Sequence, residues 1–216
     1  MILTPILRRD LAEALNRFAA DLGDVLSRRM FRRIRASSPD RAVEPEAGQH
    51  RLAALALARS CGMAVHPPEA RCQFNWDGAA LNGATEAYVI LHEVAHFALA
   101  PPERRRLIDF GLGPGPDTID RDRAERAATL SPLAREEDEA AASLLGILWE
   151  EALGQPALAS FLDQNWLEGL GRSAAGHFSG VLAGLERRGL LGPLPRSAAG
   201  PDVFLPQLFS AIGRTR

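Results

Sequence analysis

The sequence predicts an α+β fold that is mostly helical, a single domain with a small sheet packed on a buried HExxH helix. Three observations predict this class. Apolar residues recur at helical spacing over most of the chain. The best strand candidates are confined to residues 63–76. The chain of 216 residues, with a hydrophobic fraction of 46%, is long enough for one large domain with its own core.

Residues 1–35 are expected to form the N-terminal helix of this domain. Thr4-Pro5 is typical of a helix start, and apolar residues then follow at helical spacing: Leu7, Leu11, Leu15, Phe18, Leu22 and Val25. Five arginines lie near the end of this helix: Arg28, Arg29, Arg32, Arg33 and Arg35. Because cations are favourable at a helix C-terminus, we interpret them as a solvated face. Docking of an acidic partner is the alternative.

Residues 36–50 are polar and contain prolines, which indicates a linker, and residues 51–216 are expected to form the core of the domain. Gly62, Pro101 and Gly154 mark expected helix ends, and Ser131-Pro132 an expected helix start. The elements expected in the core are a helix over 51–61, strands over 63–66 and 71–76, a helix over 84–100, a short helix over 121–128, and helices over 133–153, 157–163 and 173–189.

The composition excludes several classes of function. The formal net charge of -2 gives no reason to expect nucleic acid as a partner. All 25 basic residues are arginine, so no lysine can form a Schiff base or bind phosphate in a P-loop. No apolar run reaches the ~18 residues of a membrane span, and Arg8 follows the start too closely for a signal peptide. Cys61 and Cys72 form no CxxC pair, so we expect free thiols in a reducing cytoplasm.

The segment AYVILHEVAHFALA, residues 87–100, is apolar on nearly every side, which is typical of a buried helix. Two imidazoles and a carboxylate in such surroundings are costly unless something compensates them, and a metal ion does so directly. Residues four apart lie on one helix face, so His92 and His96 can bind one ion. Glu93 would then lie within reach of a metal-bound water. Two core histidines bonded to backbone groups are the alternative.

A catalytic site of this type needs a third protein ligand and an open position. The metzincin pattern would require histidine at position 102, which is Pro102, so that class is excluded. We therefore expect a carboxylate from the helix over 133–153. Glu139 is the last acid before this helix becomes apolar and is the first choice, with Glu136 as the substitute. Glu137 and Asp138 are expected to face solvent.

Other residues near this pattern receive plainer interpretations. Small residues continue the face of Glu139, namely Ala142, Ser143 and Gly146, and they would allow the two helices to approach closely. His177 is expected to be a packed or surface histidine, with a role in the site as the alternative. The triplet Asp109-Phe110-Gly111 looks like the magnesium triplet of kinases, but the chain has no glycine-rich loop or HRD segment, so that interpretation is rejected.

The run LHEVAHFALAPPERRRLIDFG, residues 91–111, resembles the central segment of the elongation factor P hydroxylase family. In that family an HExxH helix leads into a G/P-x-x-R-R-x-L-x-D-F/Y-G stretch. The similarity covers roughly residues 75–197. It includes Pro116-Asp117, the segment NWLEG at 165–169 and the turn LPR at 194–196.

This resemblance implies an iron-dependent enzyme that hydroxylates the modified lysine of elongation factor P. It implies that His92, His96 and Glu139 bind Fe²⁺, that Glu93 serves as an acid or base beside the metal, and that residues 51–216 are the catalytic core. The segment Leu112–Gly115 lacks the aromatic and cysteine residues of the family. Another lysine-bearing protein is therefore the alternative substrate.

Two other functions stay open on the residues alone. One is a zinc peptidase, in which Glu93 would be the general base that activates a Zn²⁺-bound water. The other is a non-catalytic binding module with a structural metal or none, although structural zinc sites usually have four ligands. A protein substrate is the expected partner, with no nucleic acid and no membrane.

Overall fold

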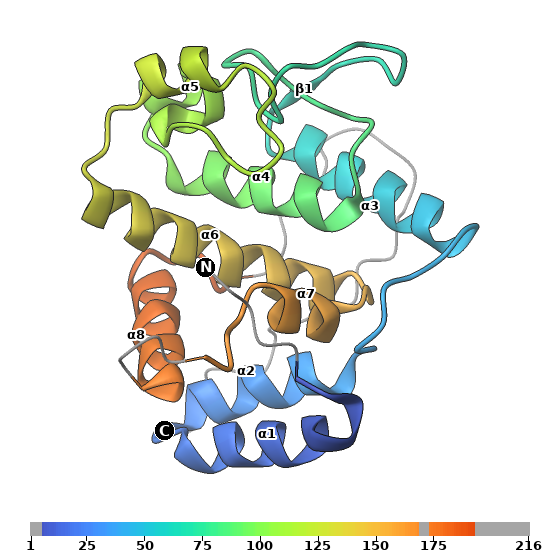
Figure 1. The fold of residues 1–216 in the computed structure, drawn as a ribbon, viewed down its shortest axis with the longest axis vertical. Helices are drawn as coiled ribbons and strands as arrows, with labels where there is room; N and C mark the ends of the chain where they lie inside the picture. Colours follow the sequence, from blue (N-terminus) through green and yellow to red (C-terminus); the bar gives the residue numbers. More distant parts are fainter. Residues whose placement is uncertain (1–5, 169–172, 193–216) are drawn as a thin grey trace, which may run out of the picture.

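A computed structural model of the chain describes residues 6–168 and 173–192. The described part is mostly helical with one small sheet, as the sequence predicts (Figure 1). Its helices are α1 (Arg8–Asp21), α2 (Val25–Ala36), α3 (Glu46–Ser60), α4 (Ala87–Leu99), α5 (Arg121–Ala127), α6 (Pro132–Ala152), α7 (Ala157–Asp163) and α8 (Ala174–Arg187). Strands β1 (Ala64–Val65) and β2 (Ala80–Leu81) pair in parallel, and two 3-10 turns, η1 (Arg104–Arg106) and η2 (Ile108–Gly111), follow α4.

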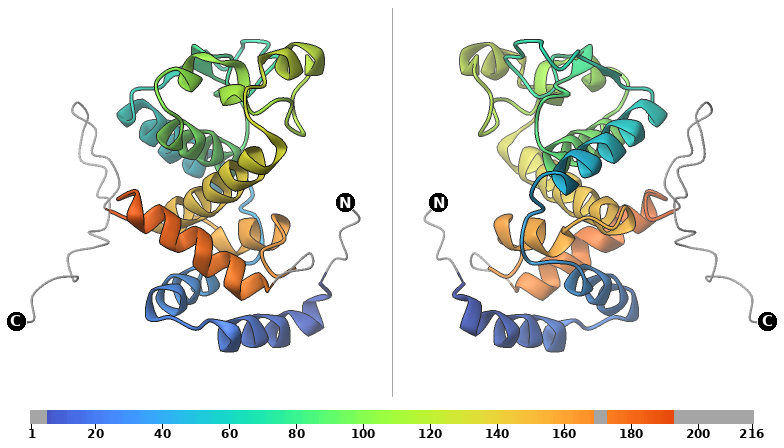
Figure 2. Two further views of the ribbon diagram at one scale, coloured as in Figure 1. Left: turned by 90° about the vertical axis from the view of Figure 1, so that its left-hand side faces the viewer. Right: turned by 90° about the vertical axis from the view of Figure 1, so that its right-hand side faces the viewer.

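Helix α6 lies at the centre of the molecule. Helix α4 packs along one side of it, and α3 packs on α4. Helices α7 and α8 pack on the opposite side of α6, with α1 and α2 beyond them (Figure 2). One hydrophobic core joins these helices through buried side chains such as Phe31, Ile90, Leu144, Phe161 and Phe178. This arrangement fixes α4 and α6 from both sides.

Helices α4 and α6 approach each other closely because a glycine lies at their contact. A Cβ added to Gly146 would lie 3.4 Å from the Cα of His92, and Ala142 is fully buried. The small residues predicted on this face of α6 therefore do bring it against α4. Helix α6 begins as predicted, with Pro132 in its first turn and the Ser131 hydroxyl accepting from the backbone N–H of Ala134. None of the helices described combines the length and apolarity needed to cross a membrane.

The second strand of the sheet is not the predicted one. The strand expected over 63–66 is present as β1, but β2 lies at Ala80–Leu81 instead of 71–76. Phe74 and Trp76 are buried by side-chain packing, and Trp76 makes only an isolated bridge to Leu81. Their alternation thus reflects burial of a loop and not a strand. Because β1 packs on α3, the expected packing of the sheet on α4 stays a prediction.

The N-terminal segment forms two helices, so the prediction of one continuous helix is wrong. The chain breaks after Leu22, where Asp24 caps α2 by accepting a 2.7 Å hydrogen bond from the backbone N–H of Ser27. Leu22 itself stays buried, whereas Leu7 and Val25 are exposed. The apolar spacing therefore predicted α1, but it did not reveal that Gly23-Asp24 starts a second helix. Thr4-Pro5 lies outside the described residues.

The arginines of α2 do not all form a solvated face. Arg33 pairs with Glu151 of α6 at 2.7 Å, and Arg35 donates to the side chain of Asn16 on α1 at 2.7 Å. Arg28 and Arg32 are exposed, as predicted. Two of the five arginines therefore tie α2 to its neighbouring helices.

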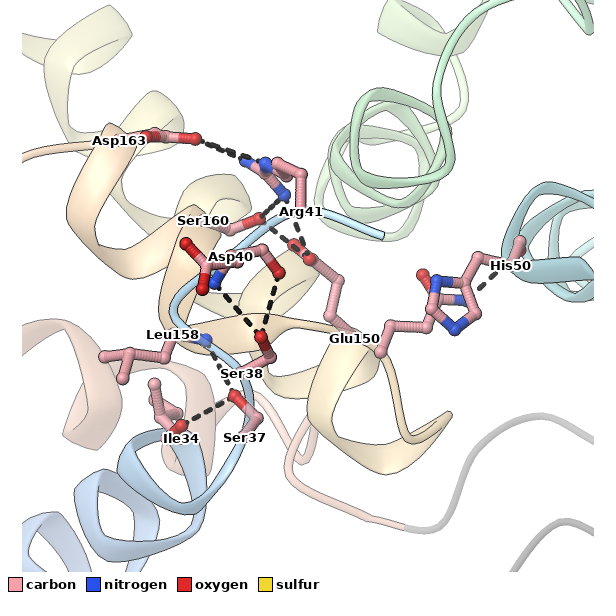
Figure 3. A network of polar contacts seen from close by, with 11 residues as sticks. Ile34, Ser37, Ser38, Asp40, Arg41, His50, Glu150, Leu158, Ser160 and Asp163 are labelled. Atoms are coloured by element: carbon pink, nitrogen blue, oxygen red, sulfur yellow. Dashed lines mark hydrogen bonds and ion pairs between the residues drawn. The ribbon is translucent and has the colours of Figure 1, made fainter. Parts of the chain in front are cut away.

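The linker is shorter than predicted, because α3 begins at Glu46, directly after Pro45. Proline suits the start of a helix, since its missing N–H has no partner there. The first residues of the linker dock on α7. The backbone N–H of Leu158 donates to the Ser37 hydroxyl at 2.8 Å (Figure 3). The backbone N–H of Ala159 donates to the carbonyl of Ser38 at 3.2 Å.

Arg41, at the end of this docked segment, joins three helices. Its guanidinium donates to Asp163 at 2.8 Å and to the Ser160 hydroxyl at 2.7 Å, both on α7. It also lies 3.6 Å from the carboxylate of Glu150 on α6 (Figure 3) and 3.8 Å from the ring centre of Tyr88 on α4. Stacking and a planar fork of donors are properties of arginine that lysine lacks. The segment expected to be a linker thus contributes to the packing of the core.

Glu150 is the buried acid of this network, and its titration should appear in the stability of the protein. Burial raises the pKa of Glu150 to about 7, although Ser160 and Arg41 act in the opposite direction. A carboxyl whose pKa is raised in the folded state stabilises the fold below its unfolded pKa, and this contribution is lost as the pH rises through about 7. In Glu150→Gln the side chain has nearly the shape of the protonated carboxyl and stays uncharged at every pH.

We therefore expect the free energy of unfolding of Glu150→Gln, relative to that of the wild type, to increase by up to about 3 kcal/mol from pH 5 to pH 8. Urea titrations at the two pH values measure this difference. Glu137→Gln, at an exposed position of the same helix, is the control and should follow the wild type. Parallel behaviour of all three proteins would contradict the prediction.

Candidate metal centre

Three side chains from α4 and α6 meet where these helices pack together. His92 and His96 lie one turn apart on α4, and their Nε2 atoms are 3.0 Å from each other. The Oε2 atom of Glu139 on α6 lies 3.4 Å from Nε2 of His92 and 3.5 Å from Nε2 of His96. Among the residues described, these three form a group whose ligand atoms all lie within 4.8 Å of one another. The three residues singled out from the sequence are thus brought together.

The spacing of these atoms fits a transition-metal ion. Bonds of about 2.1 Å at octahedral or tetrahedral angles separate neighbouring ligand atoms by about 3.0–3.4 Å. The separations of 3.0, 3.4 and 3.5 Å agree with this range. Two imidazole nitrogens and one carboxylate oxygen form a donor set that suits Zn²⁺ and non-haem Fe²⁺. Three ligands of this kind leave further coordination positions open.

The charges of the three side chains support one another. Burial would raise the pKa of Glu139, but hydrogen bonds to the two imidazoles outweigh it and hold the pKa well below its usual range. Burial would lower the pKa of His96, but Asp138 and Glu139 outweigh it and raise the pKa to about 10. For His92, burial and the neighbouring His96 lower the pKa. A proton therefore rests on His96 in the metal-free protein, and a metal ion would replace its charge.

Asp138 contacts His96 on the side away from His92 and Glu139, and the prediction that Asp138 faces solvent is wrong. Its Oδ2 atom lies 3.1 Å from Nδ1 of His96, and its side chain is only 11% exposed. Arg104 donates to both carboxylate oxygens of Asp138, each at 3.2 Å. A carboxylate on the second nitrogen of a metal-binding histidine fixes its tautomer and orientation. Glu137 is exposed, as predicted.

The Asp138–Arg104 pair gives a testable prediction about metal affinity. Asp138→Asn is expected to weaken Zn²⁺ or Fe²⁺ binding by about 10–100-fold, because such partners of ligating histidines typically contribute that much. Arg104→Ala should act in the same direction, since it leaves the Asp138 carboxylate unpaired. Competition with a chromophoric chelator measures the affinities. Arg106→Ala, an exposed arginine of the same turn, is the control, and an equal loss in that variant would contradict the assignment.

Aromatic rings hold the other face of the same histidine. The ring of Phe110 stacks on His96 with centroids 5.6 Å apart, and Trp76 stacks on Phe110 at 5.5 Å. The indole N–H of Trp76 donates to the carbonyl of Arg105 at 2.9 Å. Arg104 Nε donates to the carbonyl of Phe110, also at 2.9 Å. The segment after α4 therefore orients His96 through both charge and packing.

A cavity of about 600 Å³ is lined by side chains of α4 and α6, including the three clustered residues, and by four other parts of the chain: Asn75, residues between 109 and 118, residues between 164 and 168, and His177. The described lining has six acidic side chains and no arginine, the acids being Glu93, Asp109, Asp117, Glu136, Glu139 and Glu168. Glu136, the substitute ligand of the sequence analysis, lies in this wall and not in the cluster of three. Glu93 is mostly neutral in the metal-free protein and His96 faces the charge of Glu139, so the excess negative charge comes from the other acids. An excess of one sign of charge concentrates ligands of the opposite sign. The cavity thus favours a cationic ligand.

His177 also lines this cavity. Its position therefore agrees with the alternative interpretation, in which His177 has a role in the site. Its ring stacks on Trp166 with centroids 5.2 Å apart and planes 13° apart. The indole N–H of Trp166 donates to the Ser143 hydroxyl at 2.8 Å, one helical turn from Glu139. Trp166 is also buried in the core, so it forms both core and cavity wall.

Glu93 is buried beside the cluster, on the cavity wall. Burial raises its pKa to about 8; His96 acts against this, Asp109 and Glu139 add to it, and a hydrogen bond with Asn75 lowers it again. The carboxyl is therefore predominantly protonated at pH 7 in the metal-free protein. A buried acid with a raised pKa in a cavity is typical of a group that transfers protons.

Sequence reasoning missed the residues that support the cluster. Asp138 and Arg104 come together across 34 positions of the chain, and only the fold of the segment after α4 brings them into contact. Asn75 likewise reaches Glu93 from the loop before β2. In the sequence, the repeated arginines at 104–106 were the signal that pointed to a supporting residue in this segment. Cys61 and Cys72 are free, as predicted.

Comparisons with protein families, with curated proteins and with solved structures found no match for this chain.

Proposed function

We propose that this protein is a metal-dependent hydroxylase that inserts oxygen into a lysine side chain of a protein substrate, similar to the elongation factor P hydroxylases. The observation that carries the proposal is the cluster of His92, His96 and Glu139 on the wall of a large acidic cavity. The donor set suits both Fe²⁺ and Zn²⁺, and the resemblance of residues 91–111 is what favours Fe²⁺. In this proposal the chain forms a single catalytic domain built around the HExxH helix.

His92, His96 and Glu139 would hold the metal on one side and leave positions open toward the cavity. Bound iron supplies the activation of dioxygen, which is chemistry of the metal itself. The overall reaction transfers one oxygen atom to a C–H carbon and releases the other as water. It therefore needs two electrons from an external reductant and two protons.

The residues around the cluster prepare the cavity for this reaction. Glu93 holds a proton at its buried carboxyl in the metal-free protein and would exchange protons beside the metal. The acidic lining attracts a positively charged side chain such as that of lysine. Asp138 and the stacked ring of Phe110 keep His96 in one orientation. The proposed substrate is elongation factor P, with another lysine-bearing protein as the alternative.

A zinc-dependent peptidase is the second candidate, and the placement of Glu93 directly after a ligand favours it. Glu93 would then be the general base that takes a proton from a zinc-bound water. A peptide substrate usually binds along the edge of a sheet. The sheet in the described residues has strands of only two residues, which gives little edge for such binding.

Elemental analysis of protein purified without oxygen tests the proposal. Near-stoichiometric iron, followed by a gain of one oxygen atom on elongation factor P in mass spectrometry after incubation with dioxygen and a reductant, is the expected result. Zinc as the bound metal, no oxygen uptake and cleavage of peptides would overturn it in favour of the peptidase. His92→Ala serves as the matched protein without the cluster.

A further inference from the structure

Asp109 lies on a backbone turn of unusual conformation. Asp109 has φ 43° and ψ 39°, Phe110 has φ 54° and ψ 22°, and Gly111 has φ 72°. Residues other than glycine visit this left-handed region singly, and aspartate more readily than phenylalanine. Two such residues followed by glycine are therefore a costly arrangement, which persists only when the surroundings fix it.

The surroundings do fix this turn, at several points. The backbone N–H of Asp109 donates to the carbonyl of Trp76 at 2.9 Å, and Arg104 donates to the carbonyl of Phe110 at the same distance. The backbone N–H of Thr129 donates to the carbonyl of Gly111 at 2.8 Å. The buried ring of Phe110 is stacked on Trp76. One consequence of the conformation is that the side chain of Asp109 lies on the wall of the cavity.

The carboxylate of Asp109 has few partners in the protein. It accepts a hydrogen bond from the Thr118 hydroxyl at 2.9 Å. Burial raises its pKa, whereas Thr118, the backbone N–H of Trp76 and the charge of His96 act in the opposite direction. Within residues 6–168 and 173–192 no arginine or histidine forms an ion pair with it. The charge of His96 acts on Asp109 from beyond ion-pair distance, and a partly buried carboxylate without an ion pair is unfavourable. It also lies outside the cluster of His92, His96 and Glu139, so it is not a fourth member of that site.

We propose that Asp109 is a specificity-determining residue that binds the positively charged amino group of the substrate inside the cavity. The inference rests on the proposed function, because the cavity it concerns is the one beside the three clustered residues. Thr118 donates to Oδ2 of this carboxylate, and its side chain lines the cavity, where it can also accept from the ligand. The left-handed turn presents this carboxylate in a fixed position, so the amino group is located relative to the reacting carbon.

Small probes can test this without knowing the natural substrate. The probes are Nα-acetyl-lysine methylamide and the norleucine analogue, which has the same chain without the amino group. Ligand-observed NMR gives their dissociation constants with wild-type protein, both metal-free and loaded with Co²⁺. We expect the wild type to prefer the lysine probe. Asp109→Asn should weaken lysine-probe binding at least about tenfold, the usual contribution of a hydrogen bond to a charged group, and leave the norleucine probe unaffected.

Asparagine is a suitable replacement because it tolerates the left-handed conformation and still accepts from Thr118. Asp122→Asn removes the same charge from an exposed position on α5 and should leave the binding of both probes unchanged. Unchanged lysine-probe binding in Asp109→Asn, or no preference for the lysine probe in the wild type, would overturn the inference. A third result is a wild type that binds no Co²⁺ and still prefers the lysine probe, with that preference lost in Asp109→Asn. This result would contradict the proposed function and leave the inference on Asp109 standing.

Discussion

Glu139→Gln is expected to reduce metal affinity by more than about 100-fold and to abolish hydroxylation. Replacing a partner that only supports a ligating histidine costs about 10–100-fold, and the loss of a direct ligand should exceed that. Glutamine is nearly the same size but presents a neutral amide, which removes the charge that the two imidazoles now face at 3.4 and 3.5 Å. Metal content after dialysis and chelator competition measure the effect.

The matched control for this variant is Glu136→Gln, three residues earlier on α6. Glu136 lines the same cavity but is not part of the cluster of three, so its metal content should equal that of the wild type. The reverse result, with metal retained in Glu139→Gln and lost in Glu136→Gln, would show that the third ligand had been assigned to the wrong acid.

The choice between these two acids shows how far the sequence could lead. Glu139 lies at the edge of the apolar face of its helix, so spacing made it the first choice and left Glu136 as the substitute, and the structure brings Glu139 to the two histidines. The same reasoning failed for Asp138, one position earlier. Its neighbours in sequence are solvated acids, and its partners Arg104 and His96 lie 34 and 42 positions away. Contacts of that kind depend on the packing of separate segments, which periodicity does not register.

The same limit applies to the elements of the fold. Helix α6 was predicted to within a residue at both ends, because hydrophobic spacing and a Ser-Pro start agree there. The break between α1 and α2 was missed, since apolar spacing continues across it. The left-handed turn at Asp109 was also unforeseen, because its conformation is imposed by hydrogen bonds to distant residues. Thus the meeting of His92, His96 and Glu139 could be predicted from local pattern, whereas the contacts that support this cluster could not.

Glu93→Gln is expected to lower the rate of the reaction by about 10²–10⁴-fold while the metal stays bound, as for other residues that transfer protons. Glu93 lies next to His92 in sequence but is not part of the ligand cluster, so its replacement leaves the three ligands in place. Burial raises the pKa of Glu93 to about 8, so the carboxyl is mostly neutral at pH 7 in the metal-free protein. A neutral amide of the same shape should therefore leave the melting temperature of metal-free protein unchanged at pH 7.

These two expectations separate a chemical role of Glu93 from a structural one. Steady-state rates of oxygen uptake, or of peptide cleavage if zinc is the bound metal, give the first, and thermal melting of the metal-free protein gives the second. A lower rate with full metal content and unchanged melting assigns the loss to proton transfer, since the amide can donate a hydrogen bond but cannot take up or release the proton. An unchanged rate would show that Glu93 only fills its place in the buried face of α4, and the proton route would then have to pass through another acid of the cavity.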